Sequence, residues 1–252
     1  MTKIYLIASG KGGTGKTTTA VNLGSALNKL NEDVVVVDTN ITTPNLGLYF
    51  GAPVVPVSLN HVLQGKANID EAIYEHESGI KIVPSSLSLK DMEKLDYDKF
   101  EGISNKLRKL FSHVIYDSAA GLGEESRKAM ESCDEVVLVA NPNILSVTDA
   151  LKTIKFAEEM NKPVRGVIVT RVKGTKNDMT LKSIHEMLEV PLLGVVPEDL
   201  AVEASLNRKN SVVHTHPRSK AARAYQDIAA KLIGRKKKPE GFGKRFWKAM
   251  FG

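Results

Sequence analysis

Gly10-Lys11-Gly12-Gly13-Thr14-Gly15-Lys16-Thr17 is the most informative stretch of this chain. It fits the pattern G-x4-G-K-[ST], and it carries a second lysine near its start. The apolar run Tyr5–Ala8 precedes it, and apolar residues recur at helical spacing over Thr17–Leu30. Strand, glycine-rich loop and helix therefore follow one another in the order that a phosphate-binding loop requires.

The chemistry of this loop suits a nucleoside triphosphate. Glycines allow backbone N–H groups to approach phosphates at a helix N-terminus, Lys16 is expected on the β and γ phosphates, and Thr17 offers a hydroxyl to Mg2+. A glycine-rich turn that binds nothing is the alternative. The cofactor-binding residues expected from the loop are Gly10, Lys11, Gly12, Gly13, Thr14, Gly15, Lys16, Thr17 and Thr18.

Apolar runs of strand length alternate with helical patterns along the chain. The strand-like runs are Ile4–Ala8, Val34–Val37, Ile80–Val83, His113–Tyr116, Val136–Ala140, Val164–Val169 and Leu192–Val196. Helical spacing follows in Leu145–Met160, Thr180–Leu188 and Ser219–Ile233. This alternation predicts an α/β fold, a doubly wound, mostly parallel sheet with helices on both faces, with ligands beyond the carboxyl ends of the strands.

Composition limits the classes that remain. With 252 residues and 42% hydrophobic content, we expect one core domain over residues 1–234, followed by a basic linker at 235–241 and a separate segment at 242–252. The single cysteine, Cys133, excludes a disulfide framework. The first strand starts too early for a signal peptide, and no run reaches the roughly 18 apolar residues of a membrane span, so we expect a cytoplasmic protein.

Two carboxylates come at the ends of predicted strands. Asp38 follows Val34–Val37, and Asp117 follows His113–Tyr116. Both are expected at the nucleotide edge, where Asp38, Asp117 and Thr17 are the candidate metal ligands and Asp117 belongs to the Mg2+ shell through water. Capping of the next helix is the alternative role for Asp117.

Lys11 has no task in cradling the phosphates of its own loop. The stretch from Lys11 to Thr17 resembles the motif K-G-G-x-x-K-[ST] of the MinD/ParA family of deviant phosphate-loop (Walker A) ATPases. The resemblance implies Mg2+ and ATP as cofactors and a homodimer when ATP is bound. It also implies that Lys11 acts in trans on the phosphates of the other subunit.

The segments after both acids resemble the family's two nucleotide-sensing loops. Asp117-Ser118-Ala119-Ala120-Gly121 is similar to D-x-P-A-G, with Ala119 in place of proline, and Asp38-Thr39-Asn40 with Asn45-Leu46 is similar to D-x-D…N-L. Asn40 stands where the family has an aspartate, and an amide orients water but takes no proton. Slow, partner-stimulated hydrolysis is therefore expected. The catalytic residues that the resemblance implies are Lys11, Lys16, Asn40 and Asp117, with Asn45 and Gly121 as further nucleotide contacts.

Two later segments resemble the family's base-binding positions. Thr170-Arg171 closes one strand, and Pro197-Glu198-Asp199 follows the next. Proline and acids also suit the first turn of a helix, so base contact and simple capping remain equal alternatives for the second segment.

The carboxyl-terminal tail differs in character from the rest. From Arg235 onward it holds seven basic residues and one acidic residue, a net charge of +6 that equals the net charge of the whole chain. At 100° per residue its apolar and basic side chains fall on opposite arcs, as in a helix that lies in a bilayer interface. The residues expected to contact an anionic membrane are Phe242, Lys244, Arg245, Phe246, Trp247, Lys248, Met250 and Phe251. Docking on the protein itself, a partner groove and nucleic acid are the alternatives.

Taken with the resemblance, the tail favours a MinD-like ATPase that positions cell-division or other polar machinery, peripheral on the inner face of the cell membrane, with an activating or cargo protein of unknown identity. One alternative is a ParA-like partition ATPase that binds DNA without sequence preference. Residues 1–234 are formally neutral, which argues against nucleic acid as a partner. The other is an ATP-binding pseudo-ATPase, which Asn40 supports. Cysteine-dependent metal-cluster carriers and GTPases fit less well, because only Cys133 is present and no N-K-x-D motif occurs.

Overall fold

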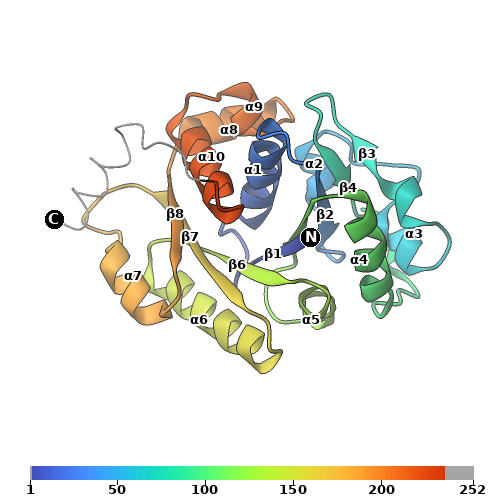
Figure 1. Cartoon of the computed structure of the whole chain (residues 1–252), viewed down its shortest axis with the longest axis horizontal. Coiled ribbons are helices and arrows are strands. Elements are labelled where there is room, and N and C mark those ends of the chain that lie inside the picture. Colours follow the sequence, from blue (N-terminus) through green and yellow to red (C-terminus); the bar gives the residue numbers. More distant parts are fainter. Residues whose placement is uncertain (1, 236–252) are drawn as a thin grey trace.

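Eight strands form one sheet, which the computed structural model describes over residues 2–235 (Figure 1). The strands are β1 (Lys3–Ala8), β2 (Val34–Thr39), β3 (Tyr74–Glu75), β4 (Lys81–Val83), β5 (His113–Ser118), β6 (Glu135–Ala140), β7 (Val164–Val172) and β8 (Leu192–Pro197). Their spatial order is β3-β4-β2-β5-β1-β6-β7-β8, and all neighbours are parallel except β3 and β4. The predicted mostly parallel sheet is confirmed, and β3 is the strand that the apolar pattern did not indicate.

Helices connect the strands. The α-helices are α1 (Lys16–Lys29), α2 (Leu46–Tyr49), α3 (Leu59–Leu63), α4 (Lys99–Leu110), α5 (Glu124–Glu131), α6 (Ile144–Glu159), α7 (Leu181–Leu188), α8 (Leu200–Asn207), α9 (Val212–Thr215) and α10 (Lys220–Leu232), and two 3-10 turns are η1 (Ile69–Ala72) and η2 (Leu89–Met92). Within residues 2–235, none of these helices has the length and apolar character needed to cross a membrane. The predicted membrane helix and all of the linker except Arg235 lie outside the described residues.

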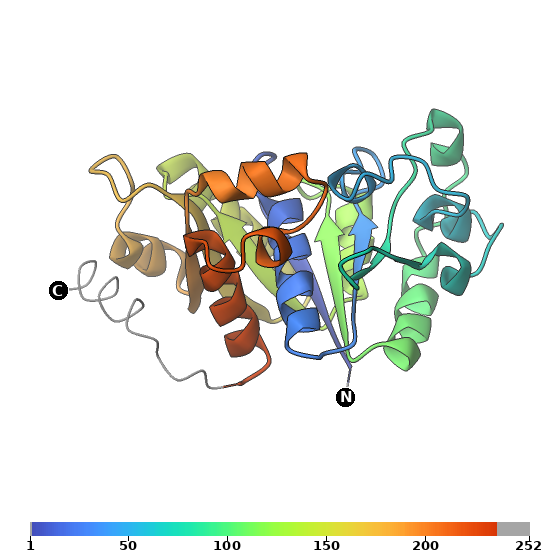
Figure 2. The same cartoon turned by 90° about the horizontal axis from the view of Figure 1, so that it is seen from above.

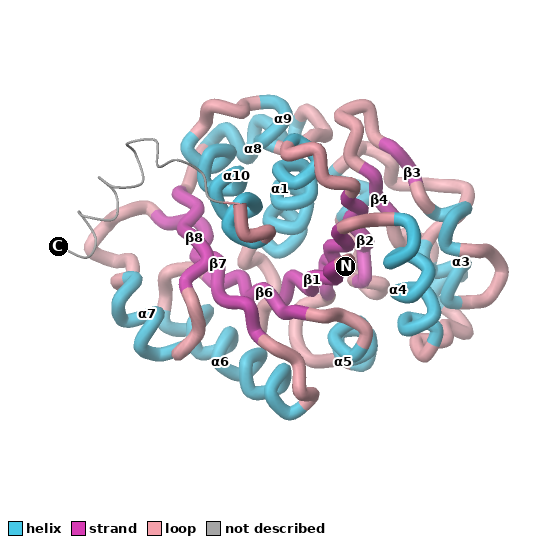
Figure 3. Tube along the Cα trace, in the orientation of Figure 1, coloured by secondary structure: helices cyan, strands magenta, loops and turns pink. Residues whose placement is uncertain are grey.

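Two helical layers cover the two faces of the sheet (Figures 2 and 3). In β5, Val114 and Tyr116 belong to the core shared with α4, α5 and α6, whereas Ile115 belongs to the core beneath α1 and α10. Successive residues of a strand point to opposite faces, so a strand covered on both sides must be apolar throughout. Each fully buried aliphatic side chain of this kind contributes about 1.5–3 kcal/mol, which explains why the central strands are continuous apolar runs.

The strand order places the functional loops at one edge. β1 lies between β5 and β6; the chain passes from β1 through α1 to β2 on one side and later adds β6, β7 and β8 on the other. The carboxyl ends of parallel strands meet at the same edge, and a crevice forms where the order reverses. The loops that follow β1, β2, β5 and β6 therefore converge.

Asp134 ties three elements together at the opposite edge. Its carboxylate accepts two hydrogen bonds from Arg108 of α4, at 2.7 and 2.8 Å, and one of 2.7 Å from the backbone N–H of Ile4 in β1. Burial raises the pKa of Asp134, but the bonds from Arg108 and Ile4 outweigh burial and hold that pKa below its usual range. The ionised carboxylate is therefore the form that stabilises the fold.

We expect Asp134→Asn to lower the free energy of unfolding by about 2 kcal/mol at pH 7, because a charge-assisted bidentate contact is lost. A carboxylate whose pKa is lowered by folding stabilises the protein at pH values above its unfolded-state pKa. This contribution disappears as the pH falls through the folded-state pKa. Urea unfolding of wild type and variant should therefore differ at pH 7 and converge in acid. Asp33→Asn, which breaks only the exposed pair with Lys81, is the control; an equal loss in both variants would contradict the prediction.

Candidate nucleotide site

The glycine-rich loop lies between β1 and α1, as the sequence predicts. At Gly10 a side chain has no room, because an added Cβ atom would lie 2.3 Å from the backbone oxygen of Asp149 in α6. Gly15 has a φ of 95°, in the left-handed region, and this turn starts α1. The carbonyl of Thr14 accepts hydrogen bonds of 2.8 Å from the Thr170 hydroxyl and 3.3 Å from the Asn141 amide. The loop is thus held from β7 and from the end of β6.

The inner side of the loop fits an anionic ligand. Cβ atoms added at Gly12 or Gly13 would meet nothing within 4 Å. The hydroxyl of Thr14 is buried and, within residues 2–235, makes no hydrogen bond. Thr17 and Thr18 lie in the first turn of α1, where backbone N–H groups have no partner within the helix. Phosphate oxygens are the natural acceptors for these groups.

Lys16, Thr17 and Asp117 come together beneath the loop. Lys16 is buried, and its ammonium donates to the Ser9 hydroxyl at 2.9 Å. Asp117 is fully buried; among the described residues neither carboxylate oxygen has a hydrogen-bonding partner of good geometry, although the nearby Thr17 hydroxyl lowers its pKa. Burial lowers the pKa of Lys16, and the charge of Asp117 opposes that shift. Buried, unpaired carboxylate oxygens beside a threonine hydroxyl suit a hydrated Mg2+ ion.

Asp38 faces Asp117 from the adjacent strand, since the two residues are in register between β2 and β5. Asp38 is the better satisfied of the pair: it accepts hydrogen bonds from the backbone N–H groups of Asn40, Asn45 and Leu46 at 3.2, 3.0 and 2.9 Å. Burial and the like charge of Asp117 raise the pKa of Asp38, and burial raises the pKa of Asp117 to about 6. A divalent cation would relieve this repulsion.

Residues 40–45, here called the Asn40 loop, follow β2. The Asn40 side chain is buried and closes a turn on Thr43: its amide donates to the Thr43 carbonyl, and its oxygen accepts from the Thr43 N–H and hydroxyl at 3.3 and 3.0 Å. Asn45 directly precedes α2, and its side-chain amide donates to the same carbonyl at 2.8 Å. Both predicted residues therefore shape the loop in this conformation.

Residues 117–123, here called the Asp117 loop, begin with the last two residues of β5 and lead into α5. Gly121 adopts a φ of 86° and faces open space, and its N–H approaches the Ser9 carbonyl at 3.5 Å. Lys11, on the neighbouring phosphate loop, is half-buried, and within residues 2–235 its ammonium has neither an ion pair nor a hydrogen bond. Lys11 is thus available to a group outside the chain described.

The predicted base-binding segments lie at the ends of β7 and β8. Thr170 is buried and bonded to the phosphate loop, whereas Arg171 is exposed with a φ of 55°. Asp199 caps α8 through the N–H of Ala201 and also accepts from the N–H of Ala221 in α10, both at 3.0 Å. Pro197 ends β8, and Glu198 pairs with Lys173 at 3.5 Å. The capping role of the Pro197-Glu198-Asp199 segment is therefore present, and base contact stays a prediction.

Three site residues were not found from the sequence. Ser9 receives the Lys16 ammonium, Asn141 holds the Thr14 carbonyl and the Thr170 hydroxyl, and Glu125 accepts hydrogen bonds from the Asn40 loop. Asn141 follows a predicted strand, so the edge rule could have found it. Glu125 lies on α5, 83 residues beyond Thr42, and no sequence signal marks it. Among the described residues there is also no group of three His, Cys, Asp or Glu side chains that could hold a metal ion by themselves.

Comparison with known proteins agrees with this geometry. Residues 5–212 match the family described as the CobQ/CobB/MinD/ParA nucleotide binding domain. An uncharacterised ATP-binding protein of Methanocaldococcus jannaschii is 42% identical over 252 residues, covering 98% of this chain and 96% of the relative. The septum site-determining protein MinD from Pyrococcus horikoshii, solved with Mg-ADP, has a TM-score of 0.88 and 32% identity, covering 93% of this chain and 97% of that one.

A complex of MinC and MinD from Aquifex aeolicus is a further structural neighbour, with a TM-score of 0.85, 26% identity and coverage of 94% of this chain and 98% of that one. The match over most of the chain, together with the phosphate loop and the paired acids, leaves one assignment. This chain belongs to the CobQ/CobB/MinD/ParA nucleotide-binding family.

Proposed function

We propose that this chain is a MinD-like ATPase that dimerises on binding Mg-ATP, attaches reversibly to an anionic membrane through paired carboxyl-terminal helices, and is released by hydrolysis. The observation that carries the nucleotide part is the fully buried Asp117, whose oxygens have no partner of good geometry among residues 2–235, beside Lys16 and Thr17 under an open glycine loop. A MinD relative solved with Mg-ADP supports the choice of ligand.

The residues of the site divide the work of phosphoryl transfer. Bound Mg2+ would supply charge neutralisation at the β and γ phosphates, held by Thr17 and, through water, by Asp117. Lys16 is buried and needs only to leave Ser9 to meet phosphate oxygens. Asn40 orients water by hydrogen bonding and takes no proton. Catalysis therefore depends on positioning and charge, and a slow basal rate is expected.

Several features support a dimer across the nucleotide edge. The Lys11 ammonium is unpaired within the described residues, and large apolar side chains are exposed on segments that follow β2, β5, β6 and β8. These exposed residues are Leu48, Leu122, Ile144, Leu145 and Leu200. Exposed apolar side chains on loops and helices that follow the strands of a polar ligand site are typical of a surface that a second protein covers. A second copy that brings its own Lys11 fits this face.

The described part of the chain ends away from that face. Arg235, the last described residue, donates to Glu32 and to the Leu30 carbonyl, in the turn that precedes β2. The amino ends of the strands lie opposite the nucleotide edge, so tails bound to lipid would leave the proposed dimer face uncovered. Each basic residue near an anionic leaflet contributes about 1 kcal/mol, so one short tail binds weakly and two bind by avidity.

Sedimentation with anionic vesicles tests this proposal. We expect the intact chain to pellet at least about tenfold more with Mg-ATP than with Mg-ADP or no nucleotide, because dimerisation doubles the number of anchors. A chain ending at Gly234 should stay in the supernatant in all three conditions while binding ATP normally. Pelleting that is independent of nucleotide would contradict the coupling of tail and ATP.

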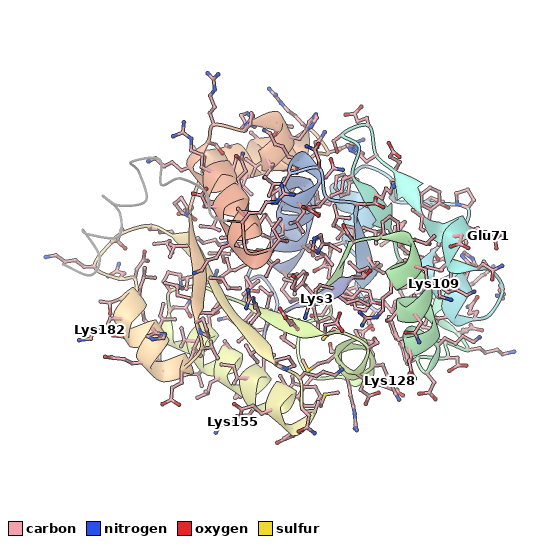
Figure 4. All side chains as sticks on the ribbon, in the orientation of Figure 1. Lys3, Glu71, Lys109, Lys128, Lys155 and Lys182 are labelled. Carbon is pink, nitrogen blue, oxygen red and sulfur yellow. The ribbon has the colours of Figure 1, made fainter. Side chains whose placement is uncertain are left out.

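DNA binding is the alternative that this experiment also addresses, with a plasmid gel shift as its second arm. Lys109, Lys128, Lys155 and Lys182 project from four different helices (Figure 4). Lys128 is paired with Asp98 and Glu131, and Lys182 with Glu186. Charges that are spread over four helices and partly paired in this way give little affinity for a phosphate backbone, so no shift is expected at physiological salt.

Asn40→Asp should raise turnover about tenfold, because the new carboxylate can accept a proton from the attacking water. The substitution also removes the donor to the Thr43 carbonyl, so the turn loses one of its hydrogen bonds. Phosphate release by purified protein at saturating Mg-ATP measures the effect. Asn40→Ala, which loses the same donor without gaining a base, is the control; an Asn40→Asp rate at or below the wild-type rate would contradict the role given to residue 40.

A further inference from the structure

The Asn40 loop has an unusual pattern of hydrogen bonds. From residue 40 to residue 46, every backbone N–H donates to a side-chain oxygen, except at Pro44, which has no N–H. Asn40, Asn45 and Leu46 donate to Asp38, and Thr43 donates to the Asn40 side chain. All of these acceptors belong to β2 or to the loop itself.

The remaining N–H groups donate to a different element. Ile41 and Thr42 donate to one oxygen of the Glu125 carboxylate at 2.9 and 3.1 Å, and the Thr42 hydroxyl donates to the other oxygen at 3.1 Å. Glu125 lies in the first turn of α5, directly after the Asp117 loop. One side chain thus joins the segment that follows β2 to the segment that follows β5.

We infer that Glu125 is a positioning residue that couples the Asn40 loop to the Asp117 loop. Its carboxylate fixes the backbone next to Asn40, so a displacement of α5 relative to the sheet is transmitted to the residue proposed above to orient the attacking water. Two independent loops would each have to order on nucleotide binding, whereas linked loops move as one unit. This inference rests on the proposed ATPase, because it concerns how that site is assembled.

The geometry separates this role from general support of the fold. Asp38 and the Asn40 side chain hold the other N–H groups of the loop, so loss of Glu125 frees only Ile41 and Thr42. The neighbouring Glu124 provides a matched control: it has the same charge in the same helix turn, is exposed, and makes no hydrogen bond or ion pair to the described residues. Any effect of charge on the N-terminus of α5 is common to both residues.

Hydrogen exchange tests the contact first. In the nucleotide-free protein, Glu125→Ala should accelerate exchange of the Ile41 and Thr42 amides about tenfold or more, because charge-assisted hydrogen bonds protect them. The Asn45 and Leu46 amides, held by Asp38, should change little, and Glu124→Ala should match wild type. Unchanged Ile41 and Thr42 amides in Glu125→Ala would overturn the inference.

Kinetics test the consequence. Glu125→Ala should lower kcat about five- to tenfold with an ATP dissociation constant within about twofold of wild type, because the loop acts on the transition state more than on binding. Glu125→Gln keeps one acceptor oxygen, so its kcat should lie between those of wild type and Glu125→Ala. If Glu125→Ala and Glu124→Ala have the same kcat, the coupling is wrong. If wild type itself binds or hydrolyses no ATP, the proposed function fails, while the exchange comparison still decides whether Glu125 holds the loop.

Discussion

Lys11→Ala is expected to lower ATP hydrolysis about a thousandfold, the scale at which a cationic group supplied by a second subunit stabilises phosphoryl transfer. The Lys11 ammonium has no partner within residues 2–235, and its loop already has Lys16 for its own phosphates. Removal of Lys11 should therefore leave ATP binding by a single chain within about twofold of wild type. Steady-state phosphate release and fluorescent-nucleotide binding at low protein concentration measure the two quantities.

Lys16→Ala is the matched control for Lys11→Ala. Lys16 is buried beneath the loop, so this variant should lose nucleotide binding itself. A mixing experiment distinguishes action in trans: a hydrolysis-dead Lys11→Ala subunit that retains ATP should recover activity at its own site when paired with wild type. If Lys11→Ala hydrolyses ATP at the wild-type rate, the trans role is wrong.

Asp117→Asn should reduce turnover at least about a hundredfold and, without nucleotide, stabilise the fold by about 1–2 kcal/mol at pH 8. The loss of turnover and the gain in stability share one cause. The carboxylate is fully buried, faces Asp38, and has no well-placed donor among the described residues. Its charge therefore destabilises the nucleotide-free protein and attracts a cation. An amide removes the charge, and with it the attraction for Mg2+.

The pH dependence follows from the direction of the shift. Because the folded-state pKa of Asp117 is raised to about 6 from 3.8, the folded protein holds a proton that the unfolded chain has released, and stability falls as the pH rises through this interval. Wild type and Asp117→Asn should therefore have similar stability at pH 4 and differ fully above pH 6. Thermal unfolding without Mg2+ measures this, and a variant less stable than wild type at pH 8 would contradict the interpretation.

The parts of the fold that the sequence predicted are those governed by local pattern. β1, β2 and β5 are buried on both faces, so their residues had to be continuously apolar, and the phosphate loop is read directly from its glycines and lysines. Helices α2 and α3, of four and five residues, and the two-residue strand β3 are too short to show a period. Tertiary contacts decide them instead.

Most residues of the site could be predicted from the sequence, but the hydrogen bonds between them could not. Asp38 and Asp117 were expected at one edge, and register between β2 and β5 brings them together. The Asp38 carboxylate accepts hydrogen bonds from three backbone N–H groups. These bonds depend on the path of the Asn40 loop, which local sequence does not determine. The Glu125 contact joins residues more than 80 positions apart and leaves no pattern in the chain.

Binding of a triphosphate should assemble two copies of this chain. Light scattering of the eluted wild-type protein, with ATP and Mg2+ in the column buffer, measures it most directly. We expect a mass twice the 27.5 kDa of one chain with Mg-ATP and a single-chain mass with Mg-ADP. A single-chain mass at saturating Mg-ATP, with nucleotide shown to be bound, would contradict it.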